Sequence, residues 1–369
     1  MKEKRFLPDG AVVYGGLMLL LLLGVAAFVF RQDFSAWERR YLAGTPENFS
    51  LSRWTLNDDM ETYLSDQIPF RRQLVNLDSA AQAMTGRAVQ LDAWPLGDAM
   101  VEKPVQAEQG AMLRRVEALR GLAGDIPCLF LTPPTAGMLR MGEMTAARRV
   151  VYEQESALYD FLTAQGGFVS LKEEFENSAE PVYYRTDHHW TLHGAYLAYR
   201  AYCRAAGLTP LEMDAFAVTE YAPFLGTTYS RSGLPFARAD TLQCAEPLWP
   251  VTMTVQGEEE TWDHLIFPGQ AATYDGYAVY LNGNHGLLTI ENPAAAGGTL
   301  FICKDSFANS LIPFLTAHYA RVIAVDARYY AGTFNQALRE AEQADAILFL
   351  YSLDSLANDT SIPRKIEKP

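Results

Sequence analysis

The stretch "TLFICKDSFANSLIPFLTAHYARVIAVDARYYAGTFNQALREAEQADAILFLYS", residues 299–352, decides the fold class. Three short apolar runs, at 299–303, 321–327 and 346–352, are separated by two segments with the apolar spacing of helices. Strands that alternate with helices in this way pair in parallel through right-handed crossovers. The stretch therefore predicts an α/β fold with a doubly wound parallel sheet. In such sheets functional groups gather beyond the carboxyl ends of the strands.

The same alternation extends upstream of this stretch. Helical spacing at 108–124 and 152–167 is followed by apolar runs near 126–131 and 168–171, and a further helix is expected over 191–207. In that last helix Thr191 is placed to cap the first turn. These elements extend the predicted sheet toward the N-terminus.

Residues 209–296 have a different pattern. Runs such as "VTMTVQ", "YAVYLNG" and "LLTIEN" are short, and Gly, Asn and acidic residues separate them. We expect an antiparallel, β-rich insertion here, inside a domain that spans 97–369.

The N-terminal segment is expected to anchor the chain in a membrane. Residues 11–30 are uncharged and mostly apolar, which matches the roughly 20 residues of a membrane-spanning helix. Basic residues in 1–10 favour a cytoplasmic N-terminus. A cleaved signal peptide is the alternative, but its apolar region is shorter and no small-residue cleavage motif follows. The prediction is a single-pass cell-membrane protein whose C-terminal domain is extracytoplasmic.

Residues 31–96 are expected to form a helical stalk or packing segment between the anchor and the domain. Their apolar residues recur at three- and four-residue spacing, interrupted at Pro69.

Composition narrows the class of partner. The chain has 369 residues, 44 acidic against 30 basic, and a net charge of -14, with no basic stripe. Nucleic-acid binding depends on neutralising phosphates with Lys and Arg, so a nucleic-acid partner is not expected. The four cysteines lie far apart without a C-x-x-C pair, which removes the common zinc patterns. Cys203 and Cys244 can either form a disulfide or be buried thiols.

Two short motifs carry the candidate chemistry. Ser306 stands where a predicted strand turns into a helix, so backbone N–H groups near it can stabilise an oxyanion. Capping of that helix is the structural alternative for Ser306. In "RTDHHWTLHG", Asp187 and His189 are separated by one residue, so the carboxylate can orient the imidazole. The pattern predicts a Ser-His-Asp triad, with a buried polar corner as the alternative.

A metal site is the third possibility for this motif. His189 and His193 are four residues apart at a predicted helix start, and Asp187 is adjacent. The position next to the first His, where zincins place a Glu, holds Trp190. No third strong ligand is evident, and no metal or other cofactor is expected.

"YYRTDHHWT", "GAYLAY", "KDSFANSLIPFLTAHY" and "DQIPFRRQ" resemble the DHHW family of bacterial cell-surface proteins. That family is similar to the circularly permuted SGNH-hydrolase domain of the periplasmic alginate O-acetylation proteins. The resemblance implies that Ser306 is the nucleophile, with His189 and Asp187 as its partners. Lys304 departs from the pattern, because the SGNH block has Gly at this position.

The sequence also offers candidates for oxyanion donors and for substrate contacts. Phe307, Gly283 and Asn284 are the expected oxyanion donors, and Trp190 and Arg185 the expected substrate contacts. The resemblance implies a membrane-anchored serine acyltransferase or esterase that O-acetylates or deacetylates a cell-surface polysaccharide. The acyl donor would come from a multispanning membrane acyltransferase. A non-catalytic polysaccharide-binding or assembly factor with a degenerate SGNH site is the alternative, and Lys304 is the feature that favours it.

Overall fold

The structure is a computed structural model that describes residues 9–46, 58–85, 93–342 and 344–366. The chain divides into two compact units. The first comprises residues 1–91 with 230–236, and the second comprises 92–229 with 237–369. Parts of the predicted helical segment at 47–57 and 86–92 lie outside the described residues.

The second unit is built on a mixed sheet of eight strands, in the order β10-β9-β11-β13-β12-β14-β5-β6. The strands β13, β12, β14, β5 and β6 are parallel, and β11, β9 and β10 are added to the β13 edge in antiparallel pairing. Their bounds are β5 Cys128–Leu131, β6 Phe168–Val169, β9 Thr252–Val255, β10 Thr261–Trp262, β11 Leu287–Glu291, β12 Thr299–Lys304, β13 Arg321–Asp326 and β14 Ala346–Leu350. The α/β class and the parallel pairing of the last three strands are as predicted.

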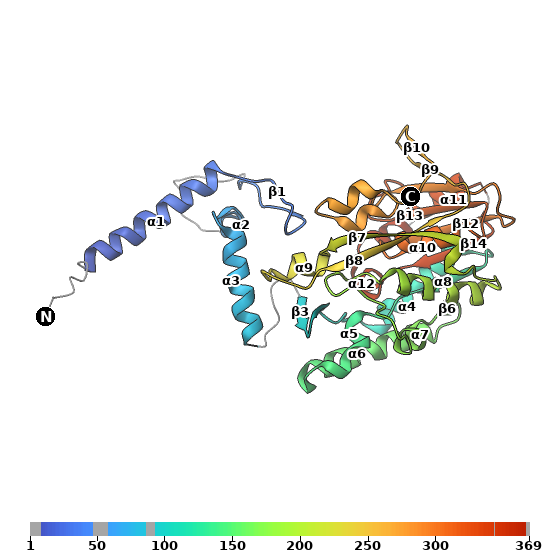
Figure 1. Cartoon of the computed structure of the whole chain (residues 1–369), viewed down its shortest axis with the longest axis horizontal. Helices are drawn as coiled ribbons and strands as arrows, with labels where there is room; N and C mark the ends of the chain where they lie inside the picture. Colours follow the sequence, from blue (N-terminus) through green and yellow to red (C-terminus); the bar gives the residue numbers. More distant parts are fainter. Residues whose placement is uncertain (1–8, 47–57, 86–92, 343, 367–369) are drawn as a thin grey trace. The chain divides into compact units, whose positions relative to one another are not determined.

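Helices cover both faces of this sheet (Figure 1). Side chains alternate along each strand, so Leu300 and Ile302 of β12 enter one core, while Phe301 and Cys303 enter the other. The first core also contains residues of α7 Lys172–Glu176, α8 Leu192–Ala206 and α10 Ala308–Leu315. The second contains residues of α4 Gln109–Ala123, α6 Ala146–Thr163, α11 Phe334–Glu340, α12 Leu353–Asn358 and α13 Ser361–Ile366. This double layer holds the carboxyl ends of the strands at one edge, where Lys304 ends the central strand β12.

The 209–296 region is antiparallel as expected, but it is not a separate insertion throughout. Strands β9, β10 and β11 extend the main sheet, because β11 pairs with β13. Only β7 Phe216–Phe224 and β8 Asp240–Pro247 form their own hairpin, joined through α9 Thr227–Ser232. The run 277–283 is not a strand: a 3₁₀ helix occupies Gly276–Val279. A second hairpin, β3 Ala93–Leu96 with β4 Ala99–Glu102, and α5 Ala136–Leu139 complete the unit.

The cysteines are all free thiols, so the structure does not contain the Cys203–Cys244 disulfide. Each of these two thiols has its own buried surroundings. Cys203 lies on α8 beside His318, and Cys244 lies on β8 in a cluster that includes Tyr280. Of the two alternatives that the sequence left open for these cysteines, the structure has the buried thiols.

The first unit contains α1 Asp9–Val29, β1 Phe34–Ser35, β2 Arg40–Tyr41, α2 Asp58–Gln67 and α3 Arg71–Met84. Within the described residues, one helix is long and apolar enough to cross a membrane, at Gly10–Val29. The break at Pro69 falls between α2 and α3, as the sequence indicated. Residues 34–41 are a short β-hairpin rather than part of a helix.

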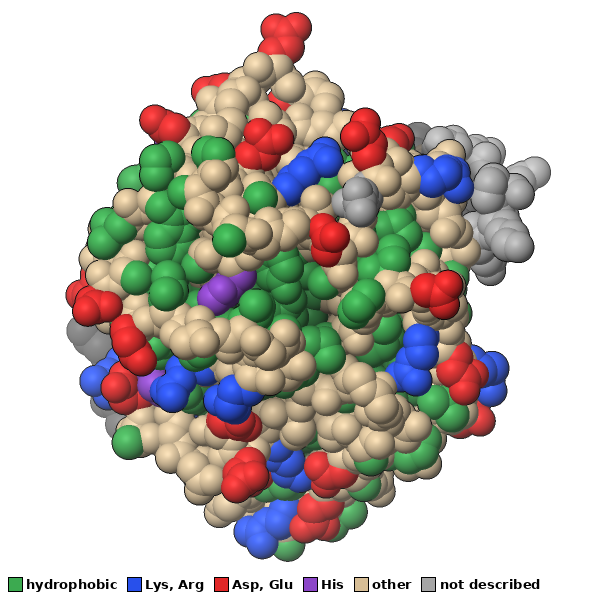
Figure 2. Space-filling view, turned by 90° about the vertical axis from the view of Figure 1, so that its right-hand side faces the viewer, with side chains coloured by type: hydrophobic (Ala, Val, Ile, Leu, Met, Phe, Trp, Pro, Cys, Tyr) green, Lys and Arg blue, Asp and Glu red, His purple; other side chains and the backbone are tan. Residues whose placement is uncertain are grey.

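Figure 2 shows one face of the molecule, with acidic and basic side chains interspersed around a hollow that apolar side chains line. The basic residues on this face form no continuous area. The excess of acidic residues is thus spread over the face rather than gathered at one place.

Candidate active site

Ser306 lies in a turn that a buried carboxylate holds in place. The turn joins β12 to α10, at the carboxyl end of the central strand. Asp305 Oδ1 accepts a hydrogen bond from Phe307 N (3.0 Å), and its Oδ2 accepts one from Ser352 N (2.7 Å). Asp305 N in turn donates to Leu350 O. Because these bonds tie the turn to the end of β14, the backbone around Ser306 is fixed before any ligand arrives.

The segment that carries Asp187 and His189 forms a second fixed loop, just before α8. An isolated bridge pairs Tyr183 with Trp190, and Thr191 caps α8 by accepting a hydrogen bond from Gly194 N. Asp240 of β8 holds the start of the loop, because its carboxylate accepts bonds from the backbone N–H groups of Arg185 and Thr186. Part of the region predicted as an insertion therefore supports this loop.

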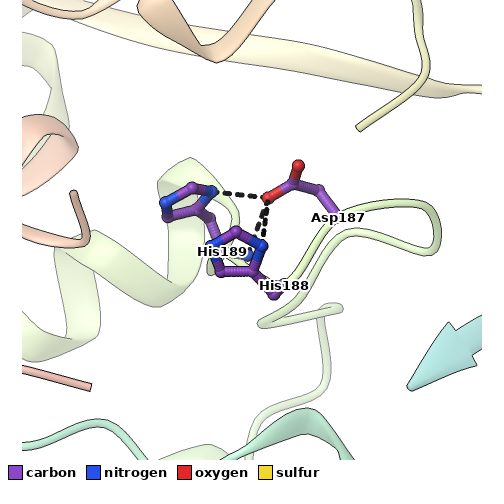
Figure 3. A group of neighbouring side chains, drawn as sticks. All are labelled: Asp187, His188 and His189. Atoms are coloured by element: carbon purple, nitrogen blue, oxygen red, sulfur yellow. Dashed lines mark hydrogen bonds and ion pairs between the residues drawn. The ribbon is translucent and has the colours of Figure 1, made fainter. Parts of the chain in front are cut away.

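Asp187 and His189 form a close pair inside this loop. Asp187 Oδ1 accepts from His189 N (2.8 Å) and lies 2.5 Å from His189 Nδ1, while Oδ2 accepts from Thr227 N (2.6 Å). Figure 3 shows the carboxylate directed at both neighbouring imidazoles. Asp187 is 1% exposed and His189 is 4% exposed. The pair is thus enclosed by protein on nearly all sides.

The other ring nitrogen of His189 reaches the serine. His189 Nε2 lies 2.8 Å from Ser306 Oγ, across 117 positions of sequence. With a proton on Nδ1 donated to Asp187, Nε2 can accept the proton of the Ser306 hydroxyl. The three predicted residues are brought together in the order carboxylate, imidazole, hydroxyl. This arrangement is able to activate a serine as a nucleophile.

Two residues that the sequence analysis missed shape the pair. Gly226 passes so close to Asp187 that a Cβ on it would collide with the carboxylate. The ring of Tyr277 stacks on the His189 ring, with centroids 3.8 Å apart and planes 5° apart. The Tyr277 hydroxyl donates to Ser310 Oγ (2.9 Å). Neither residue had a local signal in the sequence, since both come from the region of weak, turn-rich patterning.

The electrostatics keep His189 neutral and Asp187 charged near neutral pH. Burial lowers the pKa of His189, the neighbouring His188 lowers it further, and Asp187 only partly opposes them, so that it falls to about 4. Burial raises the pKa of Asp187, but His189, His188 and the hydrogen bonds from His189 and Thr227 outweigh this and hold it well below its usual range. A neutral imidazole beside a carboxylate is the resting state that a general base requires.

Two of the three predicted oxyanion donors already donate a hydrogen bond to another group. Phe307 N–H donates to Asp305, and Gly283 N–H donates to Tyr280 O, so both backbone groups already have acceptors. These two assignments are wrong for the arrangement seen here. Asn284 remains a candidate, because its Oδ1 accepts from Asn309 Nδ2 (3.1 Å), on the first turn of α10. No hydrogen bond in the described part of the chain uses the N–H of Ser306 itself.

Lys304 lies in a buried network beside the turn that carries Ser306. Its Nζ donates to Asn309 Oδ1 (2.7 Å) and lies 3.8 Å from Asp326 Oδ2. Burial lowers the pKa of its amine, while Asp326 opposes this. Since Asn309 also contacts Asn284, Lys304 helps to orient that amide. The side chain that departs from the SGNH pattern is therefore accommodated by partners of its own.

The two predicted substrate contacts differ in their exposure. Trp190 is fully buried, and its Nε1 donates to Ser310 Oγ (2.7 Å), so it presents no surface to a substrate and we correct this assignment. Arg185 pairs with Asp98 (2.9 Å) and Asp240 (3.3 Å) and braces the loop, and its side chain is 33% exposed.

The residues that could together bind a metal differ from those that the sequence predicted. His193 does not join the pair, because its Nε2 lies 3.0 Å from Ser178 Oγ. His188 does approach it: its Nδ1 lies 3.8 Å from Asp187 Oδ1, so these two and His189 form a cluster of possible ligands (Figure 3). A cation would have to replace the 2.5 Å contact between Asp187 and His189, since the ligands of one zinc ion lie farther apart. The geometry fits a shared proton better than a metal.

Residues 163–325 match the family model described as DHHW protein. We refer to these residues as the DHHW segment. It contains Asp187, His189 and Ser306, and it confirms the resemblance that the motifs indicated. A search of curated proteins gave no match.

Solved structures with the same fold support this match. A DHHW family protein from Eubacterium siraeum DSM 15702 is 19% identical, and the alignment covers 76% of this chain and 100% of that chain with a TM-score of 0.60. PatB1 from Bacillus cereus is 20% identical over 73% of this chain and 98% of that one, also with a TM-score of 0.60, and a second PatB1 structure carries a sulfonyl adduct.

A more distant match is the O-acetyltransferase domain of AlgJ from Pseudomonas putida. It is 16% identical over 73% of this chain and 95% of that chain, with a TM-score of 0.41. The two matches with a TM-score of 0.60 show that the DHHW segment and its surroundings share a fold with those two proteins.

Proposed function

We propose that this protein is a membrane-anchored extracytoplasmic serine acyltransferase or esterase with an SGNH-like catalytic domain. The observation that carries the proposal is the pair of contacts made by His189, 2.8 Å to Ser306 Oγ and 2.5 Å to Asp187. A partly exposed hydroxyl beside a buried imidazole and a buried carboxylate, in this order, supplies the parts that acyl transfer through serine requires. The helix α1 would hold the domain at the membrane surface.

The proposed reaction has two halves. Ser306 Oγ attacks the carbonyl carbon of an acyl donor while His189 Nε2 takes the hydroxyl proton, and the imidazolium then protonates the leaving group. The acyl group is left as an ester on Ser306. In the second half His189 deprotonates an acceptor hydroxyl, which attacks the ester, and the imidazolium returns the proton to Ser306 Oγ as the ester bond to Ser306 breaks. Water as acceptor gives hydrolysis, and a sugar hydroxyl gives O-acylation.

The oxyanion that forms at each half needs hydrogen-bond donors. We assign this role to the N–H of Ser306 and to the side-chain amide of Asn284, which Asn309 and Lys304 orient. The same network weakens the case for a non-catalytic factor, since that alternative rested on Lys304.

The proposed acceptor is a cell-surface polysaccharide, with the acyl group delivered by a multispanning membrane acyltransferase. The test begins with the purified full-length chain in detergent, a chromogenic acetyl ester and a panel of oligosaccharides. We expect ester cleavage that survives EDTA, and acetylated oligosaccharide by mass spectrometry for the preferred acceptor. Loss of cleavage with EDTA would favour the metal alternative. Absence of both cleavage and transfer in a folded sample would favour a binding factor.

The sulfonyl adduct named for PatB1 suggests a direct probe, since sulfonyl fluorides react with activated serine hydroxyls. We propose that Ser306 reacts in this way and that the reaction blocks ester cleavage. Labelling at any other serine with activity unchanged would count against the proposal.

The pH dependence of kcat/KM follows from the low pKa of His189. The imidazole is the active base only when neutral, so activity is present above its folded-state pKa and is lost as the pH falls through about 4. We expect the acid limb well below the ordinary histidine value of about 6.5. Replacing His188 with Gln should move the limb to higher pH, because His188 lowers the pKa of His189. A wild-type limb near 6.5 that His188→Gln does not shift would contradict this.

The same pKa has a consequence for stability. Between pH about 6.5 and 4 the unfolded chain binds a proton at this histidine and the folded chain does not. Stability contributed by the neutral ring is therefore present above the unfolded value and declines as the pH falls through that window.

Tyr277 is expected to act by holding the His189 ring in position. Replacing it with Phe keeps the stacked ring and removes only the hydroxyl bond to Ser310, so kcat should change little. Replacing it with Ala removes the stack, and loss of alignment should lower kcat by about 10- to 100-fold. The measurement is kcat for ester cleavage by both variants. Equal losses for Phe and Ala would show that the hydroxyl, rather than the stacked ring, matters.

A further inference from the structure

Helix α3 carries an exposed apolar stripe with no partner among the described residues. Phe70, Leu74, Leu77, Ala81 and Met84 follow one another at spacings of four and three residues, so they share one side of the helix. Their exposure is high for large apolar side chains, at 72% for Phe70, 48% for Leu74, 70% for Leu77 and 89% for Met84. A contiguous apolar strip of this kind marks an interaction surface.

The opposite side of α3 is already occupied. Val75 and Ser79 are its buried side chains, and the backbone of Gly233 lies against both. A Cβ on Gly233 would come within 2.7 Å of Val75 Cγ1, which shows how closely the segment 230–236 packs there. The stripe therefore points away from the rest of the first unit rather than toward a core that is still to be filled.

The beginning of α3 is tied to the end of the candidate membrane span. Tyr63 of α2 donates to Ala27 O in the last turns of α1, and its ring packs on Phe28 with centroids 4.9 Å apart. Phe30, the residue after α1, and Phe70 line the same cavity of about 410 Å³. A stripe that starts next to the end of a membrane span starts at the level of the lipid headgroups.

We propose that α3 lies in the interface of the bilayer that α1 crosses, with Phe70, Leu74, Leu77 and Met84 inserted among the lipids. This inference rests on the proposed anchoring by α1. An amphipathic helix with one apolar face binds a lipid surface in this way.

Anionic lipid is not required for this contact. The nearby basic side chains already have partners: Arg71 pairs with Glu38 (3.1 Å), and the guanidinium of Arg72 lies over the ring of Trp37 (5.5 Å). The contact is therefore apolar, and a zwitterionic phosphatidylcholine surface is sufficient. Insertion of α3 would fix the first unit on the membrane instead of leaving it on a free tether.

The test uses the full-length chain in phosphatidylcholine nanodiscs, with and without lipids brominated on their acyl chains, which quench nearby tryptophan. Three variants each add one Trp: Leu77→Trp on the stripe, Phe236→Trp in the same unit on the far side of α3, and Leu20→Trp within α1. Each variant is compared with wild type, which supplies the background from the native tryptophans. Thermal unfolding of each variant checks that the fold is retained.

We expect the Trp added at 77 to be quenched by brominated lipid at least twice as strongly as the one at 236. Strong quenching of the Trp at position 20, with equally weak quenching of those at 77 and 236, would overturn the inference. It would leave the proposed anchoring by α1 intact. Absence of quenching of the Trp at position 20 would instead contradict the proposed anchoring by α1. If the stripe instead pairs with a second copy of the chain, the variant Met84→Cys should form cross-linked dimers and the Trp at position 77 should not be quenched. That result would also overturn the lipid assignment.

Discussion

Replacing Ser306 with Ala is expected to lower kcat for ester cleavage and acyl transfer by roughly 10⁴- to 10⁶-fold, since removal of the nucleophile leaves only the remaining site. The physical reason is local. Ser306 Oγ is the atom that His189 Nε2 contacts at 2.8 Å, and alanine removes the hydroxyl while leaving the Asp305 turn in place. The fold should therefore survive, as judged by an unchanged thermal unfolding midpoint.

The chain offers a matched control for this variant. Ser178 Oγ lies 3.0 Å from His193 Nε2, so it forms a second serine-histidine contact outside the candidate site. Ser178→Ala should leave kcat within a factor of two. Equal losses in the two variants would show that the activity does not depend on Ser306 in particular.

Replacing Asp187 with Asn is the second large effect that we expect. The carboxylate accepts from the N–H of His189, from His189 Nδ1 and from Thr227 N. An amide at this position can offer a donor to Nδ1, which favours the wrong tautomer of His189. A loss of kcat of about 10⁴-fold follows, by analogy with other serine triads.

Stability should also fall in Asp187→Asn, because a buried group loses part of its hydrogen bonding, at a cost of about 1 to 3 kcal/mol. Asp98→Asn is the control, since Asp98 is half exposed and pairs with Arg185 outside the triad. Activity measured on folded protein separates the two effects. If Asp187→Asn kept near wild-type kcat, Asp187 would be a structural carboxylate rather than a member of the triad.

The strand-helix alternation at 299–352 was sufficient to predict the parallel part of the sheet. Apolar runs and helical spacing are local signals, and β12, β13 and β14 form where they indicated. The edge strands were harder to place. Strand β11 pairs with β13 through contacts between distant parts of the chain, and no local pattern distinguishes an added edge strand from an insertion.

The candidate triad could be predicted because its residue types are rare and the motif is compact. Its surroundings could not. Tyr277 stacks on His189 from a segment that resembles a strand in sequence but forms a 3₁₀ helix. Gly226 and Asp240 act through close approach and through backbone hydrogen bonds, which depend on the folded arrangement. The error at Trp190 has the same origin, because its indole bonds Ser310 from a distant part of the chain. The errors at Phe307 and Gly283 are local, because their N–H groups donate within turns to Asp305 and Tyr280.

The most direct test of the account is to find the acyl group on the protein. The full-length protein is mixed with a chromogenic acetyl ester, quenched in acid within the first turnover, digested and mapped by mass spectrometry. The account predicts one acetyl ester, on the hydroxyl of Ser306, which is absent in Ser306→Ala and still present in Ser178→Ala. Acetylation at another residue, or steady ester cleavage by Ser306→Ala at the wild-type rate, would contradict it.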